Sequence, residues 1–321
     1  MKATARAHPI QGLVKYHGLR DPELRFPYHD SISVCTAPSN TTTTVEFGVA
    51  SDRFVVDGDR LQGRAADRVS SVVDRVRALA DIDEPVRLES ENSFPTNVGL
   101  GSSSSGFAAA AMAAVEAAGL DLSRPEISTI ARRGSSSAAR AVTGGFSVLY
   151  SGLNDQDCRA ERLETPLEDE LRIVVGLVPA YKETEHAHRE AAESHMFEAR
   201  LAHLHGQNDR LKDALRSGDF DRTFDLAERD SLSLAATTMT GPAAWVYWKP
   251  ETLEIFDTVR ELREDAVTAY FSTDTGATVY VNTVEEDVET VESAVADLGV
   301  DTEVWEVGGP ASILPASDAL F

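Results

Sequence analysis

The amino-acid sequence predicts an α+β fold built of two lobes. Its 321 residues are enough for one large domain or two ordinary ones, and strand-like and helix-like segments are mixed in both halves. An acidic stretch at 163–170 contains a proline and is followed by an apolar strand. We therefore place a boundary near residue 168 and expect lobes over 1–168 and 169–321.

Periodicity predicts the elements of the first lobe in order. Residues 44–56 alternate as strands, 64–80 carry apolar residues at helical spacing, and 86–90 resemble a strand. A Gly/Ser-rich loop follows. After it, an Ala-rich segment predicts a helix that ends near Ala118, because Gly119 is a typical helix stop.

A capping signature opens the next helix. Ser123 and Glu126 flank Pro125, the pattern of a capping box with proline in the first turn. The remaining predicted elements are strands at 173–178, 267–270, 278–281 and 302–307 and helices near 187–205, 221–236, 250–263 and 284–298.

Charge and composition restrict the partners and the compartment. There are 53 acidic and 30 basic residues, and nucleic acid and anionic membranes both need a basic surface, so neither is expected as a partner. No run approaches about 18 apolar residues, and the N-terminus lacks the apolar stretch of a signal peptide. Only Cys35 and Cys158 occur, which suits a reducing cytoplasm. A homodimer is left open.

The strongest local signal is the loop Pro-Thr-Asn-Val-Gly-Leu-Gly-Ser-Ser-Ser-Ser-Gly at 95–106. Its glycines allow a ligand to approach the backbone, and it leads into a helix N-terminus that favours an anion. A polyphosphate is the expected ligand, although no Gly-Lys-Ser/Thr of a Walker loop follows. A flexible linker is disfavoured between a strand and a helix. The predicted phosphate-binding residues are Pro95, Gly99, Gly101, Ser102, Ser103, Ser104 and Gly106.

This loop resembles the ATP-phosphate loop of the GHMP kinases, and four other segments are similar to those of diphosphomevalonate decarboxylases. These segments are Val14–Asp21 with Asp30–Val34, Ser90–Thr96, Ile130–Arg140 with Gly144–Phe146, and Ala269–Gly276. The resemblance implies a two-lobed GHMP-kinase fold, with a ribosomal-protein-S5-like first lobe and a ferredoxin-like second lobe. It also implies that ATP phosphorylates a tertiary alcohol, which then loses phosphate and carbon dioxide to form an alkene.

The resemblance assigns roles to residues that suit this chemistry. Asp274 orients the hydroxyl or takes its proton, although without the resemblance the sequence favours a turn residue before Thr-Gly. The planar guanidinium of Arg140 can donate two parallel hydrogen bonds to the substrate carboxylate. Without the motif, this arginine would be interpreted as a surface residue at a helix end. Ser135 and Ser137 share the substrate contacts, and either could also cap a helix.

Three further residues complete the predicted site. The compact ammonium of Lys15 suits the charge on the transferred phosphoryl oxygens, or orients Asp274. Tyr16 packs in the cleft against substrate. Ser103 is the candidate for contact with the ATP phosphates and Mg²⁺, with Ser102 and Ser104 supporting it.

The sequence departs from the decarboxylase pattern in ways that bear on the substrate. Leu19 replaces a second lysine and His17 a tryptophan, while Lys182-Glu183-Thr184 aligns with a Ser-Ser-Thr segment that serves the substrate diphosphate. Glu183 would repel a diphosphate, whereas Lys182 can hold one phosphate. We therefore expect 5-phosphomevalonate as substrate and isopentenyl phosphate as product.

Three alternatives stay open at this point. The first is a decarboxylase of diphosphomevalonate, and the second is a mevalonate-type kinase that does not decarboxylate. The second is disfavoured because such kinases are understood to lose the Lys/Asp pair that Lys15 and Asp274 supply here. The third, a non-catalytic nucleotide-binding protein, is disfavoured by the presence of the whole set of site residues.

The acidity itself generates a prediction. The formal net charge is −23, and only five of the 30 basic residues are lysines. Molar salt shrinks the Debye length to about 3 Å and screens such self-repulsion. We expect folding and activity to be weak in dilute buffer and to recover in molar KCl, measured by thermal unfolding and turnover across a KCl series. Full stability at low salt would contradict adaptation of this kind.

Overall fold

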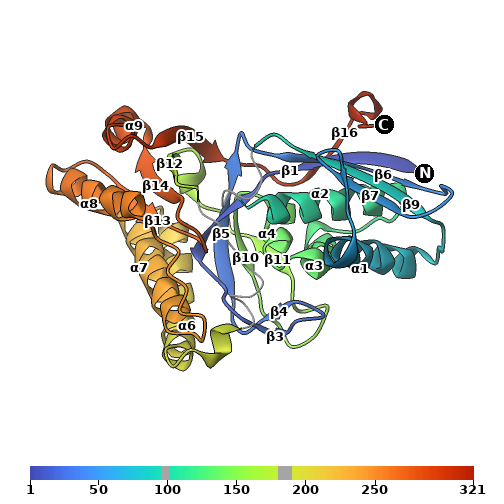
Figure 1. The fold of residues 1–321 in the computed structure, drawn as a ribbon, viewed down its shortest axis with the longest axis horizontal. Coiled ribbons are helices and arrows are strands. Elements are labelled where there is room, and N and C mark those ends of the chain that lie inside the picture. The colour runs from blue at the N-terminus through green and yellow to red at the C-terminus, as the bar shows by residue number, and fades with distance from the viewer. Residues whose placement is uncertain (95–100, 180–189) are drawn as a thin grey trace.

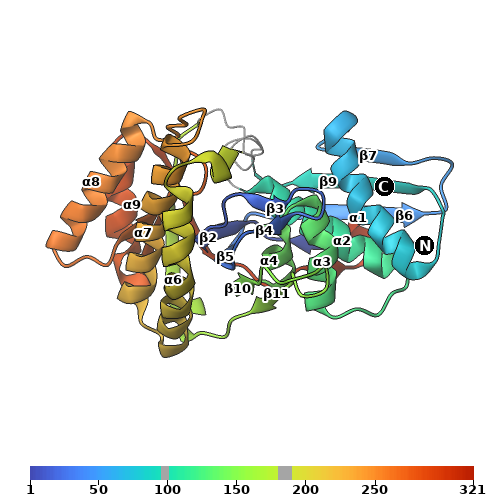
Figure 2. The same ribbon diagram turned by 90° about the horizontal axis from the view of Figure 1, so that it is seen from below.

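The computed structural model describes residues 1–94, 101–179 and 190–321. Figures 1 and 2 show an elongated molecule, with one group of helices at each end and strands running between them. Both chain termini lie at the end that carries the first helices (Figure 1). The arrangement agrees with the predicted α+β class.

One end of the molecule is a six-stranded sheet covered by helices. The strand order is β16-β1-β6-β9-β7-β8. The strands are β1 (Lys2–Ala7), β6 (Thr41–Phe47), β7 (Arg53–Val56), β8 (Asp59–Arg60), β9 (Val86–Asn92) and β16 (Ser312–Leu314). The helices are α1 (Gly63–Ala80), α2 (Ser102–Ala117), α3 (Arg124–Gly134) and α4 (Ala138–Thr143). Alanines of α2 and valines of α1 and the sheet form the core between these layers.

The other end is built on an eight-stranded sheet of order β11-β10-β5-β15-β12-β14-β13, in which β2 also pairs with β5. The strands are β2 (Ile10–Val14), β5 (Ser31–Ala37), β10 (Phe146–Leu149), β11 (Ala160–Arg162), β12 (Leu171–Leu177), β13 (Tyr270–Ser272), β14 (Val279–Val284) and β15 (Asp301–Val307). A small pair is formed by β3 (Leu19–Asp21) and β4 (Phe26–Pro27).

Helices cover both faces of this second sheet. They are α6 (Phe197–Ser217), α7 (Phe220–Met239), α8 (Pro250–Glu264) and α9 (Val288–Ala296), and α6 lies alongside α7 in both views (Figures 1 and 2). Ile173 and Val175 of β12 belong to the core that includes α6 and α7, whereas Val174 belongs to the core that includes α8 and α9. Burial on both faces explains why β12 is continuously apolar from Ile173 to Leu177.

The C-terminal segment ties the two ends together. β15 pairs with β5, and β16 then returns to pair with β1 in the first sheet. The eight-stranded sheet therefore contains strands from both sides of residue 168, and the lobe boundary at that residue stays a prediction. Short 3₁₀ turns complete the chain at Pro166–Glu168, Ala191–Glu193, Glu285–Asp287 and Ala316–Asp318.

Several predicted elements are confirmed, and the capping box is among them. The Glu126 carboxylate accepts hydrogen bonds from the Ser123 backbone N–H at 2.8 Å and from the Ser123 hydroxyl at 2.6 Å. The first of these bonds satisfies a backbone N–H that the start of a helix leaves open. The Ala-rich helix ends at Ala117, one residue from the position that Gly119 predicted.

Two expectations were wrong in position. The helix expected near 187–205 overlaps α6 but ends too early, because α6 runs from Phe197 to Ser217. Its buried positions recur at helical spacing up to Gly218, whose φ of 68° ends it. The strand expected at 267–270 begins at Tyr270. Ahead of it, the Thr268 N–H donates to the Asp287 carboxylate at 2.8 Å instead of joining a strand ladder.

The described part of the chain contains no helix with the length and apolarity needed to span a bilayer.

Candidate active site

The outer edge of β2 brings two predicted site segments together. Gln11 pairs with Val34 of β5, so the N–H groups of Ile10 and Gly12 point to the other side of the strand. The Ile10 N–H lies 3.3 Å from the Ser104 Oγ, and the Gly12 N–H lies 3.3 Å from an Asp274 Oδ1. Two residues span about 7 Å of strand, so the start of α2 and the predicted acid lie along one edge of β2.

The start of α2 divides its serines into two kinds. Gly101 has a φ of 76°, and a Cβ there would lie 3.2 Å from the Ser104 Oγ, so the turn favours glycine. The Ser104 hydroxyl donates to the Gly101 carbonyl at 2.6 Å, and buried Ser105 bonds to Thr41 at 2.7 Å. These hydroxyls hold the helix start, whereas Ser103 is exposed.

The open face of this helix end suits an anionic ligand. Ser102 is half-buried, and a Cβ at Gly106 would meet no atom within 4 Å. Backbone N–H groups and the helix dipole favour an anion at such a terminus. Pro95 and Gly99, two of the predicted phosphate-binding residues, lie outside the described residues. The contacts of all seven with ATP stay a prediction.

Lys15 directly follows β2 and is buried, with 5% of its side chain exposed. Its Nζ donates to the Ser231 Oγ at 3.1 Å and lies 3.6 Å from an Asp230 carboxylate oxygen. Burial lowers the pKa of Lys15, and the negative charges of Asp230 and Asp274 oppose that effect.

Gly12 allows Lys15 and Asp274 to lie close to the same point of the strand. A Cβ on Gly12 would lie 2.6 Å from the Lys15 Cγ and 2.8 Å from the Asp274 Oδ1. Both distances are shorter than real Cβ contacts. Any residue with a Cβ would therefore force one of the two charged side chains to shift.

Arg140 of α4 is buried, yet much of its hydrogen-bonding capacity is unused. It is 2% exposed, and within the described residues its Nε and Nη1 have no hydrogen-bond partner. Its guanidinium carbon lies 5.6 Å from the centre of the half-buried Tyr16 ring. Burial lowers the pKa of Arg140 to about 10, while Tyr16 and Asp274 act in the opposite direction. A buried cation with unused donors suits a bound anion.

The two predicted substrate serines lie just before Arg140. The Ser135 and Ser137 hydroxyls are 2.8 Å apart. Ser137 is the N-cap position of α4, but its side chain makes no capping hydrogen bond. Both hydroxyls can therefore turn toward a ligand, and their substrate contact stays a prediction. Lys182, the fifth predicted substrate residue, lies outside the described residues.

The comparisons with known proteins agree with this arrangement. Residues 7–160 match the family model described as a diphosphomevalonate decarboxylase-like N-terminal domain. The chain is 69% identical to a phosphomevalonate decarboxylase of Haloferax volcanii, over 100% of both chains. The chain belongs to the mevalonate-type decarboxylase family. The predicted resemblance is confirmed.

Solved structures of decarboxylases in this family share the fold. A crystal structure of mevalonate diphosphate decarboxylase from Staphylococcus aureus superposes with a TM-score of 0.93 at 28% identity, covering 98% of each chain. The structure of MDDEF in complex with MVAPP, AMPPCP and magnesium has a TM-score of 0.91 at 28% identity, covering 98% of this chain and 99% of that one. The predicted two-lobed fold is confirmed.

Sequence reasoning missed two charged residues at the candidate site. Asp230 of α7 and Arg200 of α6 are 0% and 2% exposed, and they contact both Lys15 and each other. A signal existed, because each lies on the buried face of its helix, among apolar residues at helical spacing. A charged residue on such a face needs a buried partner.

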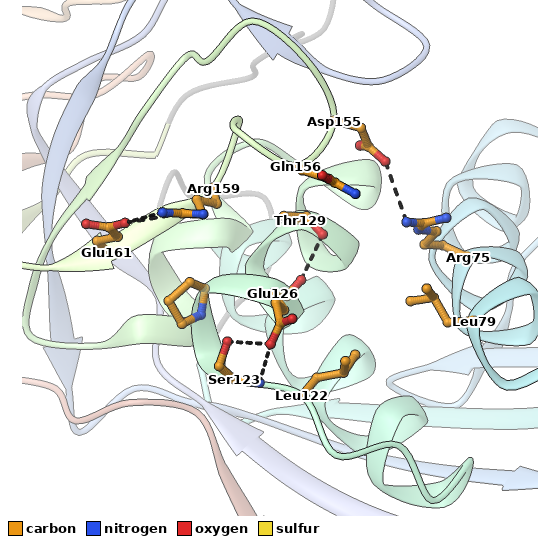
Figure 3. Close-up of a pocket in the computed structure, with 11 residues that line it drawn as sticks. Arg75, Leu79, Leu122, Ser123, Glu126, Thr129, Asp155, Gln156, Arg159 and Glu161 are labelled. Atoms are coloured by element: carbon orange, nitrogen blue, oxygen red, sulfur yellow. Dashed lines mark hydrogen bonds and ion pairs between the residues drawn. The ribbon is translucent and has the colours of Figure 1, made fainter.

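A separate cavity of about 610 Å³ lies between α1, α3 and the segment around Asp155. Two ion pairs lie among its charged side chains, and Glu126 bonds to Ser123 (Figure 3). Arg159 bonds to Glu161, and Arg75 lies 3.9 Å from Asp155. None of the predicted site residues lines it, so it is not the candidate active site.

The close packing at Gly12 generates a prediction. In Gly12→Ala the new methyl group must displace Lys15 or Asp274. A misplacement of about 1 Å at a reacting group can cost about 10²-fold, so turnover should fall by that order. Gly309→Ala is the matched control, because a Cβ there meets no atom within 4 Å. Turnover in Gly12→Ala equal to that of the control would contradict the account.

Proposed function

We propose that the protein catalyses the ATP-dependent decarboxylation of (R)-5-phosphomevalonate to isopentenyl phosphate, with release of ADP, phosphate and carbon dioxide. This is the decarboxylation step of the alternative mevalonate route to isoprenoids. The full-length similarity to the Haloferax phosphomevalonate decarboxylase supports this substrate. Diphosphomevalonate decarboxylases are more distant, for example 29% identical in Aspergillus fumigatus.

The observation that carries the proposal is the buried guanidinium of Arg140. Two of its donor nitrogens lack partners among the described residues, and the side chain is nearly sealed from solvent. A substrate carboxylate would satisfy a planar fork of this kind with two parallel hydrogen bonds. Arg140 would thereby hold the group that leaves as carbon dioxide.

Asp274 and Lys15 suit the first step, which makes the tertiary hydroxyl a good leaving group. Asp274 accepts the hydroxyl proton while the oxygen forms a bond to the γ-phosphorus of ATP and the bond to ADP breaks. Lys15 places a positive charge beside the transferred phosphoryl oxygens. Elimination then breaks the carbon–oxygen bond to phosphate and the carbon–carbon bond to the carboxylate, whose electrons form the alkene.

The start of α2 fits ATP and its magnesium ion. Exposed Ser103 and half-buried Ser102 lie in the first turn, beside Gly106, where a ligand can approach. Mg²⁺ takes oxygen ligands, and Ser103 would add a hydroxyl to those of the phosphates and water. When bound, the ion neutralises charge on the phosphates. The related structure with AMPPCP and magnesium supports both ligands for this family.

Diphosphomevalonate stays the second candidate substrate, and a kinase without decarboxylation the third. The Lys182-Glu183-Thr184 segment, on which the choice of phosphate rests, lies outside the described residues. Leu19 in β3 stands where the decarboxylase pattern has a second lysine after Lys15, so this chain has one positive charge fewer at that position. Arg140 favours decarboxylation over a simple kinase, because a kinase does not need to grip the carboxylate.

Substitution of the acid tests the proposed chemistry. Asp274→Asn keeps the size of the side chain and removes its charge, so turnover of 5-phosphomevalonate should fall by about 10²-fold or more. ATP binding should survive, because the first turn of α2 is unchanged. Arg140→Lys keeps the charge but loses the two-pronged contact, and it should also lower turnover. Release of ADP and of carbon dioxide is measured separately.

The controls are exposed residues of the same types. Asp297→Asn and Arg216→Lys change side chains at the surface, and both should leave turnover unchanged. Near-normal turnover in Asp274→Asn would refute the role assigned to that carboxylate.

A further inference from the structure

Two buried residues from the helices α6 and α7 surround Lys15. The Lys15 backbone N–H donates to the Asp230 Oδ2 at 2.9 Å, and the Lys15 carbonyl accepts from the Arg200 Nη2 at 2.8 Å. The Lys15 Nζ lies 3.6 Å from the same Asp230 Oδ2. The backbone and the side chain of one residue are thus held by the same pair.

The pair is also internally bonded. The Arg200 Nη2 donates to the other carboxylate oxygen of Asp230 at 3.0 Å, and its Nη1 lies 3.4 Å from the Asp230 carbonyl. Asp230 therefore uses one oxygen for Arg200 and the other for Lys15. Burying such charges carries a large desolvation cost, and apolar residues of similar size are often as stable or more so. A stabilising role alone explains the pair poorly.

Ser231 links this arrangement to the segment that carries Asp274. Its hydroxyl accepts from the Lys15 Nζ at 3.1 Å and from the Thr273 backbone N–H at 3.1 Å. Thr273 directly precedes Asp274. One turn of α7 therefore contacts both the lysine and the strand end that presents the acid.

We propose that Asp230 and Arg200 are positioning residues for Lys15. Asp230 holds the ammonium beside Asp274 and keeps it positively charged, and Arg200 fixes Asp230 and moderates its charge. This inference deepens the proposed function and rests on it for its catalytic consequence. The two residues act through Lys15 and need no contact with substrate.

The electrostatic consequences have opposite signs for the two residues. Burial is the largest influence and lowers the pKa of Lys15; Asp230 on α7 and Asp274 on the loop after β13 raise it, and Arg200 on α6 lowers it. The neighbouring His29 stays neutral near pH 7, because burial and Arg200 lower its pKa to about 4. Asp230→Asn should therefore lower the pKa of Lys15, and Arg200→Gln should raise it.

The pKa of Lys15 can be measured without substrate. The chain has only five lysines, so side-chain NMR of lysine-labelled protein gives few signals, and Lys15→Arg assigns the one of interest. In Asp230→Asn the titration of Lys15 should move down by about one pH unit or more, the scale for an opposite charge within a few ångströms. In Arg200→Gln it should move up.

Glu228→Gln is the matched control. Glu228 lies on α7, is largely buried, and pairs with Arg263 at 2.7 Å. It also accepts the Phe271 N–H at 3.2 Å, so the variant weakens the same helix and strand without touching Lys15. The Lys15 titration should not move in this variant.

Each outcome decides the proposal. Opposite displacements in the two variants support it, and unchanged titrations or displacements in the same direction overturn it. If Asp230→Asn does not fold, Arg200→Gln alone decides, because a rise supports the proposal and no change or a fall overturns it. These results do not depend on the substrate, so failure of the proposed function is seen separately, as absence of turnover in the wild type.

A pH profile tests the catalytic consequence. If the charged form of Lys15 is needed, activity is lost as the pH rises through its pKa. The alkaline limb of kcat/KM for 5-phosphomevalonate should therefore move to lower pH in Asp230→Asn and stay in place in Glu228→Gln. An alkaline limb that does not move in Asp230→Asn, while the Lys15 titration does, would overturn the catalytic part.

Discussion

The edge of β2 that faces away from β5 is the constraint on which the site depends. The Ile10 N–H donates to Ser104, at the start of the helix that follows the phosphate loop. The Gly12 N–H donates to Asp274, which lies late in the chain. Residue 15, just beyond the same strand, is held by α6 and α7. One short strand thereby sets the separation between the expected ATP phosphates, the acid and the lysine. Phosphoryl transfer depends mainly on such positioning.

The charged side chains of the site are shielded from solvent, so they interact mainly with one another. The side chains of Lys15, Arg140 and Arg200 are almost completely buried, and that of Asp230 has no solvent exposure. The carboxylates of Asp230 and Asp274 keep Lys15 closer to its charged form, while Arg140 retains donors that the described protein does not use. A low-dielectric pocket strengthens each of these interactions. We interpret the unused donors as capacity reserved for the anionic substrate.

Much of this arrangement could be predicted from the sequence, and the reasons for the remainder are physical. The phosphate loop, Lys15, Arg140 and Asp274 carry local patterns that resemble those of a known family, and periodicity located most elements. Asp230 and Arg200 carry no motif, because their role depends on two helices packing against a strand 185 to 215 positions earlier in the chain. The end of α6 was misplaced because periodicity marks helix ends poorly. Gly12 was overlooked because its importance lies in the closeness of two side chains.

The central claim is that this constellation couples phosphoryl transfer from ATP to decarboxylation of a monophosphorylated mevalonate. The most direct measurement incubates the purified protein in molar KCl with ATP and either mevalonate, 5-phosphomevalonate or 5-diphosphomevalonate, and quantifies ADP and carbon dioxide together. The account predicts equal amounts of ADP and carbon dioxide with 5-phosphomevalonate, and little of either with the other two compounds. Efficient release of carbon dioxide from the diphosphate with little from the monophosphate, or formation of ADP without carbon dioxide, would contradict it.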